Sequence, residues 1–548
     1  GESGSEKQEA KKSNSQNDDG EETNSDENGN SINHEKESKP TDIDQFEPSC
    51  QTDENFRKNE DNLVSQECKP YVYAKIPKAN LENIVTPAKR VHQLLEKYYF
   101  NHSGAPERSA RFESYASSKV KEFKSKNERY VSLLAKEFEM KKAARAYAKA
   151  KVSNTGDIDI SKLYKYQVED NIFRKMMRVP KGKSHGLVLL LDRSGSMSRN
   201  MAGSIEQILV LAMFCRKVNI PFVLYGFGDV TESRAVDYPG YDIKKNACFQ
   251  QNVNEFSFDT VFLREYINSK MSNSEFNRCI RNLVLLKESY TSGYHSLGRP
   301  MSEHLGNTPL LQAMIALEPI TKDFRKVNNL DLVNLVVVHD GDADNTSRIN
   351  VERDPHEWEK QGEKIIRPTS FNSSRENVFI KDYESKLQVK IEPSILNGFY
   401  DESFRIAIFD WFRAKTGAKI FGFFIAGQGR ELRQALAHRY VNKDGKSINE
   451  MIKEKYSSTH MMISPDKSDI VKDIVAKMKS EKFIQSYNKG YEAFFIMPGG
   501  SDLQIEDEEL VVTGTVTANK LKTAFMRMNK KKAVNRVMVS RFIDGIAA

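Results

Sequence analysis

An apolar run that ends abruptly in polar residues constrains this chain more than any other feature. Residues 187–191 read Leu-Val-Leu-Leu-Leu, and residues 192–196 read Asp-Arg-Ser-Gly-Ser. An uninterrupted apolar run of this length is typical of a central parallel strand that is buried on both faces. Open α/β sheets bind ligands beyond the carboxyl ends of their strands. The run therefore predicts an α/β fold with a site directly after this strand.

Asp192, Ser194 and Ser196 supply one carboxylate and two hydroxyls at alternate positions. Such hard oxygen ligands suit Mg²⁺ or Mn²⁺, which keep coordination positions open for water or for a partner's carboxylate. The same short pattern also occurs where Ser or Asp caps a helix, so the pentapeptide alone does not establish a metal site.

Two later segments favour the metal interpretation. Residues 306–310 (Gly-Asn-Thr-Pro-Leu) predict a tight loop that offers one hydroxyl, followed by a helix with Pro309 at its first position. Residues 332–338 predict a second apolar strand, which leads to a carboxylate two positions later. Parallel strands deliver their carboxyl ends to one edge of a sheet. The candidate ligands that we expect to converge there are Asp192, Ser194, Ser196, Thr308 and Asp340.

These three segments, in this order and in these strand contexts, resemble the metal-ion-dependent adhesion site of von Willebrand factor A domains. The resemblance implies a doubly wound, mainly parallel, Rossmann-like α/β sheet. It also implies that the metal completes its shell with an acidic side chain of a protein ligand. His339 stands where many family members have Thr. We expect His339 to be a hydrogen-bonded structural residue and not a ligand.

The segment upstream of the first strand narrows the resemblance. Residues 155–163 (Thr-Gly-Asp-Ile-Asp-Ile-Ser-Lys-Leu) are similar to a linker in cobaltochelatase subunits of the CobT type. The order of acidic part, helical region, linker and A domain is also similar. This resemblance implies a MoxR- or CobS-type AAA+ ATPase as partner, with this chain as a non-catalytic coupling subunit. In the chelatases the machine inserts a metal into a tetrapyrrole, whereas related phage proteins need not act on one.

Charge divides the chain unequally. Residues 1–67 contain 19 acidic and 7 basic side chains, a net charge of −12, whereas the whole chain carries +7 and the remainder therefore +19. The acidic part is poor in large apolar residues and cannot bury enough surface to offset its ordering entropy. The predicted organisation is a disordered tail at 1–75, a helical region and linker at 80–180, an A domain at 183–510 with insertions at about 230–300 and 343–400, and a basic amphipathic helix at 515–548.

The positive charge outside the tail leaves a second class of function open. Basic clusters occur at residues 141–151 and again in the predicted C-terminal helix. For residues 141–151 we expect a solvated helix face and not a nucleic-acid contact. No Gly-rich RNA-stacking signature accompanies the C-terminal cluster, so nucleic-acid binding is not favoured there either. A nucleic-acid-binding or ribonucleoprotein A-domain protein is therefore the alternative to the coupling subunit.

Cysteine usage argues against a secreted adhesion protein. The chain has five cysteines and no Cys-x-x-Cys pair, so neither a disulfide framework nor a structural zinc site is expected. This pattern suits a reducing cytoplasm. No stretch approaches the ~18 apolar residues of a membrane span. The chain begins with Gly1 and not Met, which is compatible with a fragment or a processed product.

Common catalytic signatures are missing from the sequence. It has no Gly-x-x-x-x-Gly-Lys-Ser/Thr loop for ATP phosphates, no His-Glu-x-x-His and no Gly-x-Ser-x-Gly. Ser194 has no candidate base at a telling spacing. The sequence thus predicts a binding protein without catalytic activity of its own.

Overall fold

The computed structural model describes most of the chain between residues 69 and 500. The described residues are 69–101, 106–148, 151–153, 159–168, 176–178, 184–243, 245–291, 297–341, 343, 347–353, 365–373, 375–382, 385–393, 402–456 and 464–500. The acidic residues up to 68 and the helix predicted at 515–548 lie outside them, so both remain predictions.

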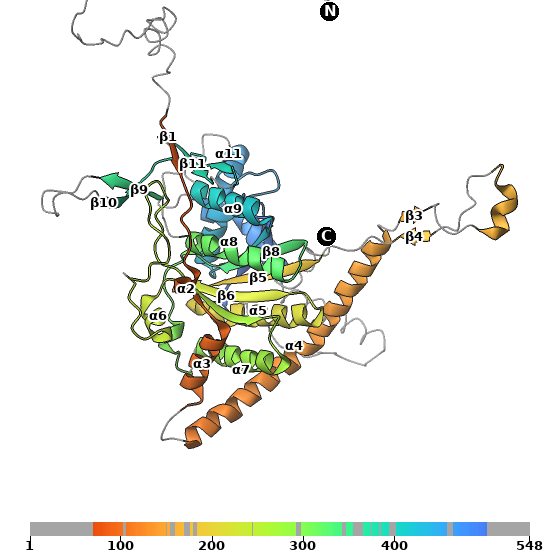
Figure 1. The fold of residues 1–548 in the computed structure, drawn as a ribbon, viewed down its shortest axis with the longest axis horizontal. Coiled ribbons are helices and arrows are strands. Elements are labelled where there is room, and N and C mark those ends of the chain that lie inside the picture. The colour runs from red at the N-terminus through yellow and green to blue at the C-terminus, as the bar shows by residue number, and fades with distance from the viewer. Residues whose placement is uncertain are drawn as a thin grey trace, which may run out of the picture. The chain divides into compact units, whose positions relative to one another are not determined.

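An eight-stranded sheet lies at the centre of the described part (Figure 1). All neighbours from β15 to β6 run parallel, whereas β14 and β7 run antiparallel to β15 and β6. The fold is therefore mixed α/β with a mostly parallel sheet. In spatial order the strands are β14 (Ile484–Ser486), β15 (Ala493–Pro498), β13 (Lys419–Ala426), β8 (Leu332–His339), β5 (His185–Asp192), β6 (Phe222–Gly228), β7 (Phe262–Asn268) and β2 (Val85–Thr86).

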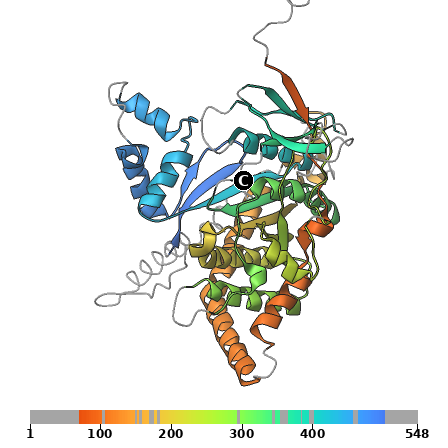
Figure 2. The ribbon, with the colours of Figure 1, turned by 90° about the vertical axis from the view of Figure 1, so that its left-hand side faces the viewer.

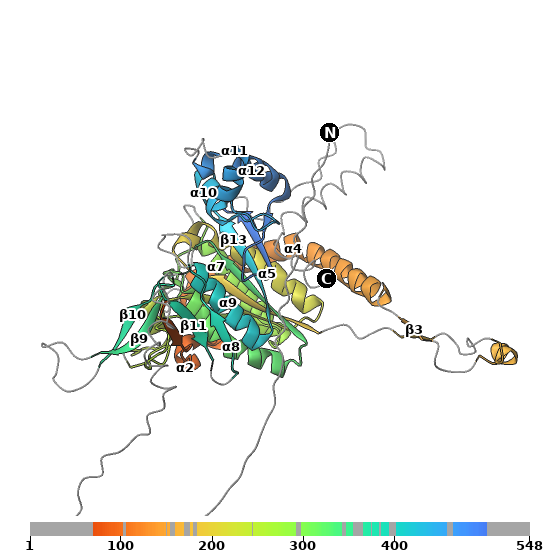
Figure 3. The same cartoon turned by 90° about the horizontal axis from the view of Figure 1, so that it is seen from above.

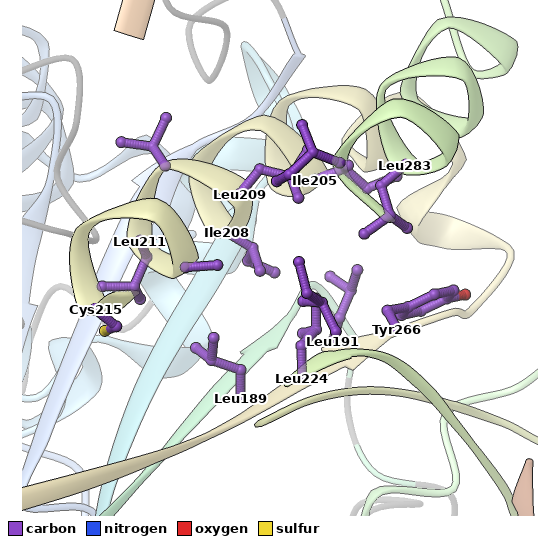
Figure 4. Close-up of a cluster of buried hydrophobic side chains, with 14 of the residues drawn as sticks. Leu189, Leu191, Ile205, Ile208, Leu209, Leu211, Cys215, Leu224, Tyr266 and Leu283 are labelled. Atoms are coloured by element: carbon purple, nitrogen blue, oxygen red, sulfur yellow. The ribbon is translucent and has the colours of Figure 1, made fainter. Parts of the chain in front are cut away.

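Strand β5 is the predicted apolar run, and it is buried on both faces because its side chains alternate between two cores. Leu189 and Leu191 belong to the core under α5 (Met201–Lys217), whereas Val188 and Leu190 belong to the core on the opposite face. Figure 4 shows Leu189 and Leu191 facing the apolar side chains of α5. Each face of β5 is thus covered by helices, as the continuous apolar pattern requires.

The helices divide between the two faces of the sheet. One core contains residues of α5 together with α3 (Ala88–Tyr99), α4 (Pro106–Ala148) and α7 (Asn273–Ser289). The other contains residues of α8 (Leu310–Val327) and α9 (Glu402–Thr416). Helix α8 begins one residue later than predicted, because Pro309 occupies the N-cap position.

A third cluster of helices lies beside the end of the sheet that β13, β15 and β14 form (Figure 3). It consists of α10 (Arg430–Arg439), α11 (Ile448–Tyr456) and α12 (Asp469–Glu481), with η4 (Pro465–Lys467) between the last two. Their buried side chains pack with Phe424 of β13 and with Phe494 and Ile496 of β15. These helices extend the molecule on one side of the carboxyl edge of the sheet.

The residues before β5 contribute to the same sheet and the same cores. Strand β2 follows α2 (Leu81–Ile84) and pairs in parallel with β7, and Phe138 of α4 packs edge-on against Phe214 of α5 at 5.7 Å. Strand β1 (Tyr71–Ala74) lies inside the range 1–75 that was predicted to be a disordered tail. That prediction is wrong for these residues, because β1 pairs with a strand some 300 positions away.

The remaining described elements are short and lie in the segments that connect the main helices and strands. They are β3 (Lys151–Ser153), η1 (Ile160–Lys165), β4 (Met176–Arg178), η2 (Ser196–Arg199), α6 (Thr231–Asp237), η3 (Met301–Glu303), β9 (Arg348–Arg353), β10 (Ile365–Ser370), β11 (Asn377–Lys381) and β12 (Gln388–Lys390).

No helix in the described part is both long and apolar enough to cross a membrane.

Candidate metal-binding site

The first predicted segment forms a compact turn at the end of β5. Asp192 is fully buried, and its Oδ1 accepts a hydrogen bond from the backbone N–H of Ser194 at 2.9 Å. The chain then enters η2, which begins at Ser196. The hydroxyl oxygens of Ser194 and Ser196 lie 3.0 Å apart. Asp192 therefore shapes the turn that brings the two hydroxyls together.

The second carboxylate meets this turn from the neighbouring strand. Asp340 follows the last residue of β8, and its Oδ1 accepts a hydrogen bond from the Ser196 hydroxyl at 2.5 Å. Its Oδ2 accepts a hydrogen bond from Nδ2 of Asn200 at 3.1 Å. The two parallel strands thus deliver their polar ends to one place, as the sequence predicted.

Thr308 borders the same place from the loop before α8. A Cβ atom built on Gly341 would lie 3.2 Å from the Thr308 hydroxyl and 3.8 Å from the Ser196 hydroxyl. Both hydroxyls therefore lie close to the backbone of Gly341, and a side chain at this position would press on the Thr308 hydroxyl. The structure brings Ser194, Ser196, Thr308 and Asp340 together, with Asp192 directly behind Ser194.

The donor set fits a small hard cation. Neighbouring oxygens in an octahedral Mg²⁺ shell lie ~3 Å apart, because the metal–oxygen distance is about 2.1 Å. The Ser194–Ser196 separation of 3.0 Å matches that spacing. Among the described residues, no three His, Cys, Asp or Glu side chains gather at one point. The candidate thus differs from imidazole or thiolate sites and depends mainly on hydroxyls.

Burial makes the Asp340 carboxylate costly to ionise. Desolvation raises its pKa above the ordinary range, although hydrogen bonds from Ser196 and Asn200 oppose this effect. A divalent cation at this position would favour the ionised form, because it would replace the lost hydration with direct coordination.

Arg193, which stands between Asp192 and Ser194 in the sequence, contacts the loop around residues 302–304 and not the candidate ligands. The Arg193 guanidinium is buried, and its Nη2 donates hydrogen bonds to the backbone carbonyls of Ser302 at 3.0 Å and His304 at 3.2 Å. The same nitrogen lies 3.3 Å from Oε2 of Glu303. Arg193 therefore fastens the loop that leads to Thr308 onto the end of β5.

Glu303 is the centre of a buried ionic cluster on that side. It is fully buried, and its Oε1 accepts a hydrogen bond from Nε of Arg264 at 3.1 Å. The Tyr266 hydroxyl donates to its Oε2 at 2.6 Å, and Arg264 also pairs with Asp237. Burial opposes the ionisation of Glu303, but Arg264 and Arg193 hold its pKa below the ordinary value. The Glu303 carboxylate is therefore ionised, and each of its two oxygens accepts a hydrogen bond.

Backbone and carboxylate contacts fix the Thr308 loop further. The N–H of Gly195 donates to the carbonyl of Gly306 at 2.8 Å, and the N–H of Gly306 donates to the carbonyl of Arg193 at 3.0 Å. Asp229, just after β6, accepts hydrogen bonds from the backbone N–H of Asn307 at 2.9 Å and from its Nδ2 at 2.7 Å. The loop is thus held from two strands.

His339 has the structural role that we expected. Its side chain is buried, its ring packs edge-on against Phe424 at 5.4 Å, and its Nδ1 lies 2.9 Å from the carbonyl oxygen of Gly341. A carbonyl only accepts, so Nδ1 carries the proton and donates. His339 therefore supports the turn that carries Asp340 instead of belonging to the donor set.

A cleft of about 2090 Å³ opens beside the site. Ser196, Asp340 and Gly341 line one part of it, and α9, α10 and β12 contribute other parts. Its walls carry side chains of both charges, such as Arg199, Arg439 and Glu402. Pockets for small molecules are ~300–1,000 Å³ in volume, so this cleft is large enough to take a protein segment.

Sequence reasoning missed three residues that shape the site: Asn200, Asp229 and Glu303. Asp229 follows the carboxyl end of a buried strand, so the rule that found Asp192 and Asp340 also points to it. Glu303 stands in a loop without any periodic pattern, and the sequence offers no signal that would have identified it.

Comparisons with known proteins do not identify this chain. No family model matches it, and no curated protein does. Among solved structures, it has a distant similarity to the open conformation of the pilus adhesin SpaC from Lactobacillus rhamnosus GG, with 15% identity and a TM-score of 0.22. That match covers 47% of this chain and 27% of the adhesin chain. A similarity this weak supports no conclusion about fold or function.

Proposed function

We propose that this chain is a non-catalytic protein-binding subunit built on a von Willebrand factor A domain with a metal-ion-dependent adhesion site. One observation carries the proposal: two strand ends and one loop, far apart in sequence, place Ser194, Ser196, Thr308 and Asp340 around one point. That arrangement follows the order of the family's three motif segments.

The residues that would hold Mg²⁺ or Mn²⁺ are the two carboxylates and three hydroxyls described above. The metal would supply a Lewis-acid position at which a partner's carboxylate binds. Asp192 keeps Ser194 in place, and Asn200 orients the Asp340 carboxylate. Ser196 is exposed, so its side of the site is open to the adjoining cleft.

The partner that we propose is a MoxR- or CobS-type AAA+ ATPase, as in the CobT-like subunits. The chain has no phosphate-binding loop of its own, which supports a division in which the partner hydrolyses ATP. The size of the cleft supports a protein segment as the group that reaches the metal, and a divalent cation would select a carboxylate of that segment. The target on which such a complex acts is left open.

Metal titration tests the site directly. We expect isothermal titration calorimetry with MnCl₂ and MgCl₂ to show one site in the full chain. The variant Ser196→Ala/Asp340→Asn should lose it, because both oxygens face the same point. Ser198→Ala is the matched control, since Ser198 is exposed in the same short helix. Undiminished binding by the double variant would overturn the site.

Partner binding needs a separate measurement. The purified MoxR/CobS-type ATPase of the same genome should bind the full chain in Mg²⁺ and be released by EDTA. The Ser196→Ala/Asp340→Asn variant should fail to bind it, whereas Ser274→Ala, at an exposed serine of α7 outside the cleft, should bind normally. If the double variant binds the ATPase as tightly as the wild type does, or if EDTA does not weaken binding by the wild type, the partner does not use this metal site.

A further inference from the structure

A second small sheet carries an unusual surface near the cleft. Strand β11 lies between β1 and β12, parallel to the first and antiparallel to the second (Figure 2). Val72, Val378 and Val389 turn inward and pack on the core beneath. Alternation along a strand therefore places Tyr71 and Tyr73 on the outer face.

Three aromatic rings form a continuous stack on that outer face. The ring of Phe379 lies 5.2 Å from that of Tyr73 and 6.1 Å from that of Tyr71, at interplanar angles of 23° and 9°. Tyr71 is 60% exposed and Tyr73 41% exposed. Single exposed aromatic residues are ordinary, but three contiguous rings form a patch that favours a ligand with flat surfaces.

Lysines surround the stack. The Nζ of Lys381 lies 5.2 Å from the centre of the Tyr73 ring, and Lys390 stands opposite Phe379 in the register of β11 and β12. Lys75 is exposed and follows Tyr71 and Tyr73 at the next alternate position. Lys390 has an acidic neighbour, Glu392, at 3.7 Å, and that carboxylate is itself largely exposed.

We propose that this aromatic and basic face binds single-stranded nucleic acid. Bases stack on exposed aromatic rings regardless of sequence, and lysine ammonium groups neutralise the backbone phosphates. A duplex hides its base faces within its own stack, so the rings select unpaired strands. The net charge of +19 outside residues 1–67 favours the same polyanion. This proposal is independent of the metal site.

The test uses the full chain and fluorescein-labelled oligouridine and oligothymidine of about 12 nucleotides, followed by fluorescence anisotropy. We expect Tyr71→Ala/Tyr73→Ala to weaken binding about tenfold or more, because each lost stack removes a base contact. Tyr71→Phe/Tyr73→Phe should bind as the wild type does, since it keeps both rings. Tyr115→Ala is the matched control, a tyrosine that is 37% exposed on α4.

Salt dependence separates phosphate contacts from stacking. Lys381→Gln/Lys390→Gln should reduce the slope of log K against log salt by about 1.4, or ~0.7 for each lost phosphate contact. Preference for oligouridine over oligothymidine would identify RNA as the ligand, and the reverse preference DNA. Unchanged affinity of the Tyr71→Ala/Tyr73→Ala variant for both probes would overturn the proposal. EDTA should have no effect on this binding, so its outcome is independent of the metal site.

Discussion

The two sides of the β5 end differ in how their polar groups are satisfied. On one side, Glu303 is enclosed by Arg193, Arg264 and Tyr266, without contact with solvent. On the other side, Ser196 is exposed and its hydroxyl reaches Asp340 at the rim of a cleft. Arg193 thus belongs to a closed cluster around Glu303, whereas the next residue, Ser194, belongs to an open cluster with Ser196 and Asp340. The closed cluster fixes the loop geometry that the open one needs.

The largest expected effect is on the closed side. Glu303→Ala leaves two arginines buried without their shared carboxylate, and we expect a loss of ~3–5 kcal/mol in the free energy of unfolding. Urea denaturation followed by circular dichroism measures it. Glu492→Ala is the control, because Glu492 pairs with Lys419 on the surface and should cost ~0–1 kcal/mol. Similar losses of unfolding free energy in both variants would show that burial does not make the Glu303 cluster more important for stability than an exposed ion pair.

Asp192→Ala should lower stability less and remove metal binding. Its carboxylate accepts the buried N–H of Ser194, so we expect a loss of ~1–3 kcal/mol from the unsatisfied donor. Calorimetry with MnCl₂ should show no binding. Asp192→Asn separates the effects, since its amide oxygen still accepts the N–H while the charge is lost. Full Mn²⁺ affinity in Asp192→Asn would show that this carboxylate is not a ligand.

Asn200→Ala probes the support of the open side. Its amide holds Asp340 and also accepts the N–H of Gly500 at 2.8 Å. We expect ~10–100-fold weaker Mn²⁺ binding, as for other residues that orient metal ligands. The cost in stability should be about 1–2 kcal/mol, because two ordinary hydrogen bonds are lost. A drop in stability without any change in metal affinity would contradict the orienting role.

The smallest expected effect is the pH response of the closed side. His92 Nε2 donates to the carbonyl of Tyr266 at 2.6 Å, and Nδ1 accepts from Asn282 at 3.2 Å. Burial lowers the pKa of His92 below 6.5, and Arg278 acts in the same direction. The hydrogen bond to the Tyr266 carbonyl opposes this shift, as do Glu96 and Glu303. A lowered pKa means that its contribution to stability is present above pH 6.5 and is lost as the pH falls.

Thermal unfolding between pH 5 and pH 7.5 checks this expectation, because the midpoint should decline on the acidic side. His92→Gln keeps a donor and an acceptor but has no titrating ring, so its decline should be shallower. An identical pH profile for the variant would assign the acid sensitivity to other groups.

The sequence predicted the strand ends well because local patterns determine them. Apolar runs of this length, of which the second is interrupted only by Asn334, are typical of the centre of a parallel sheet. A carboxylate one or two positions after each run marks the carboxyl end. This reasoning placed Asp192 and Asp340 at strand ends on one edge of the sheet, and the structure shows that the two strands are direct neighbours. The predicted loop and helix after Thr308 were also found, with a shift of one residue at Pro309.

Long-range partnerships could not be predicted in the same way. Nothing near Glu303 in sequence indicates that Arg193 and Arg264 will enclose it, and charged residues are rarely buried. Strand β1 is short and follows an acidic stretch, and its partner β11 is remote in sequence. Composition describes segments on average, whereas these contacts depend on which segments meet.

The pair of backbone hydrogen bonds between residues 193–195 and Gly306 has a mechanical consequence. A partner attached at Ser194, Ser196 and Thr308 would pull on two segments that are already tied together. The load would be shared between β5, in the middle of the sheet, and α8, which starts two residues after Thr308. A pulling force applied at the site would then enter the molecule through a strand that is hydrogen-bonded to a neighbour on both sides, so the attachment point would resist detachment.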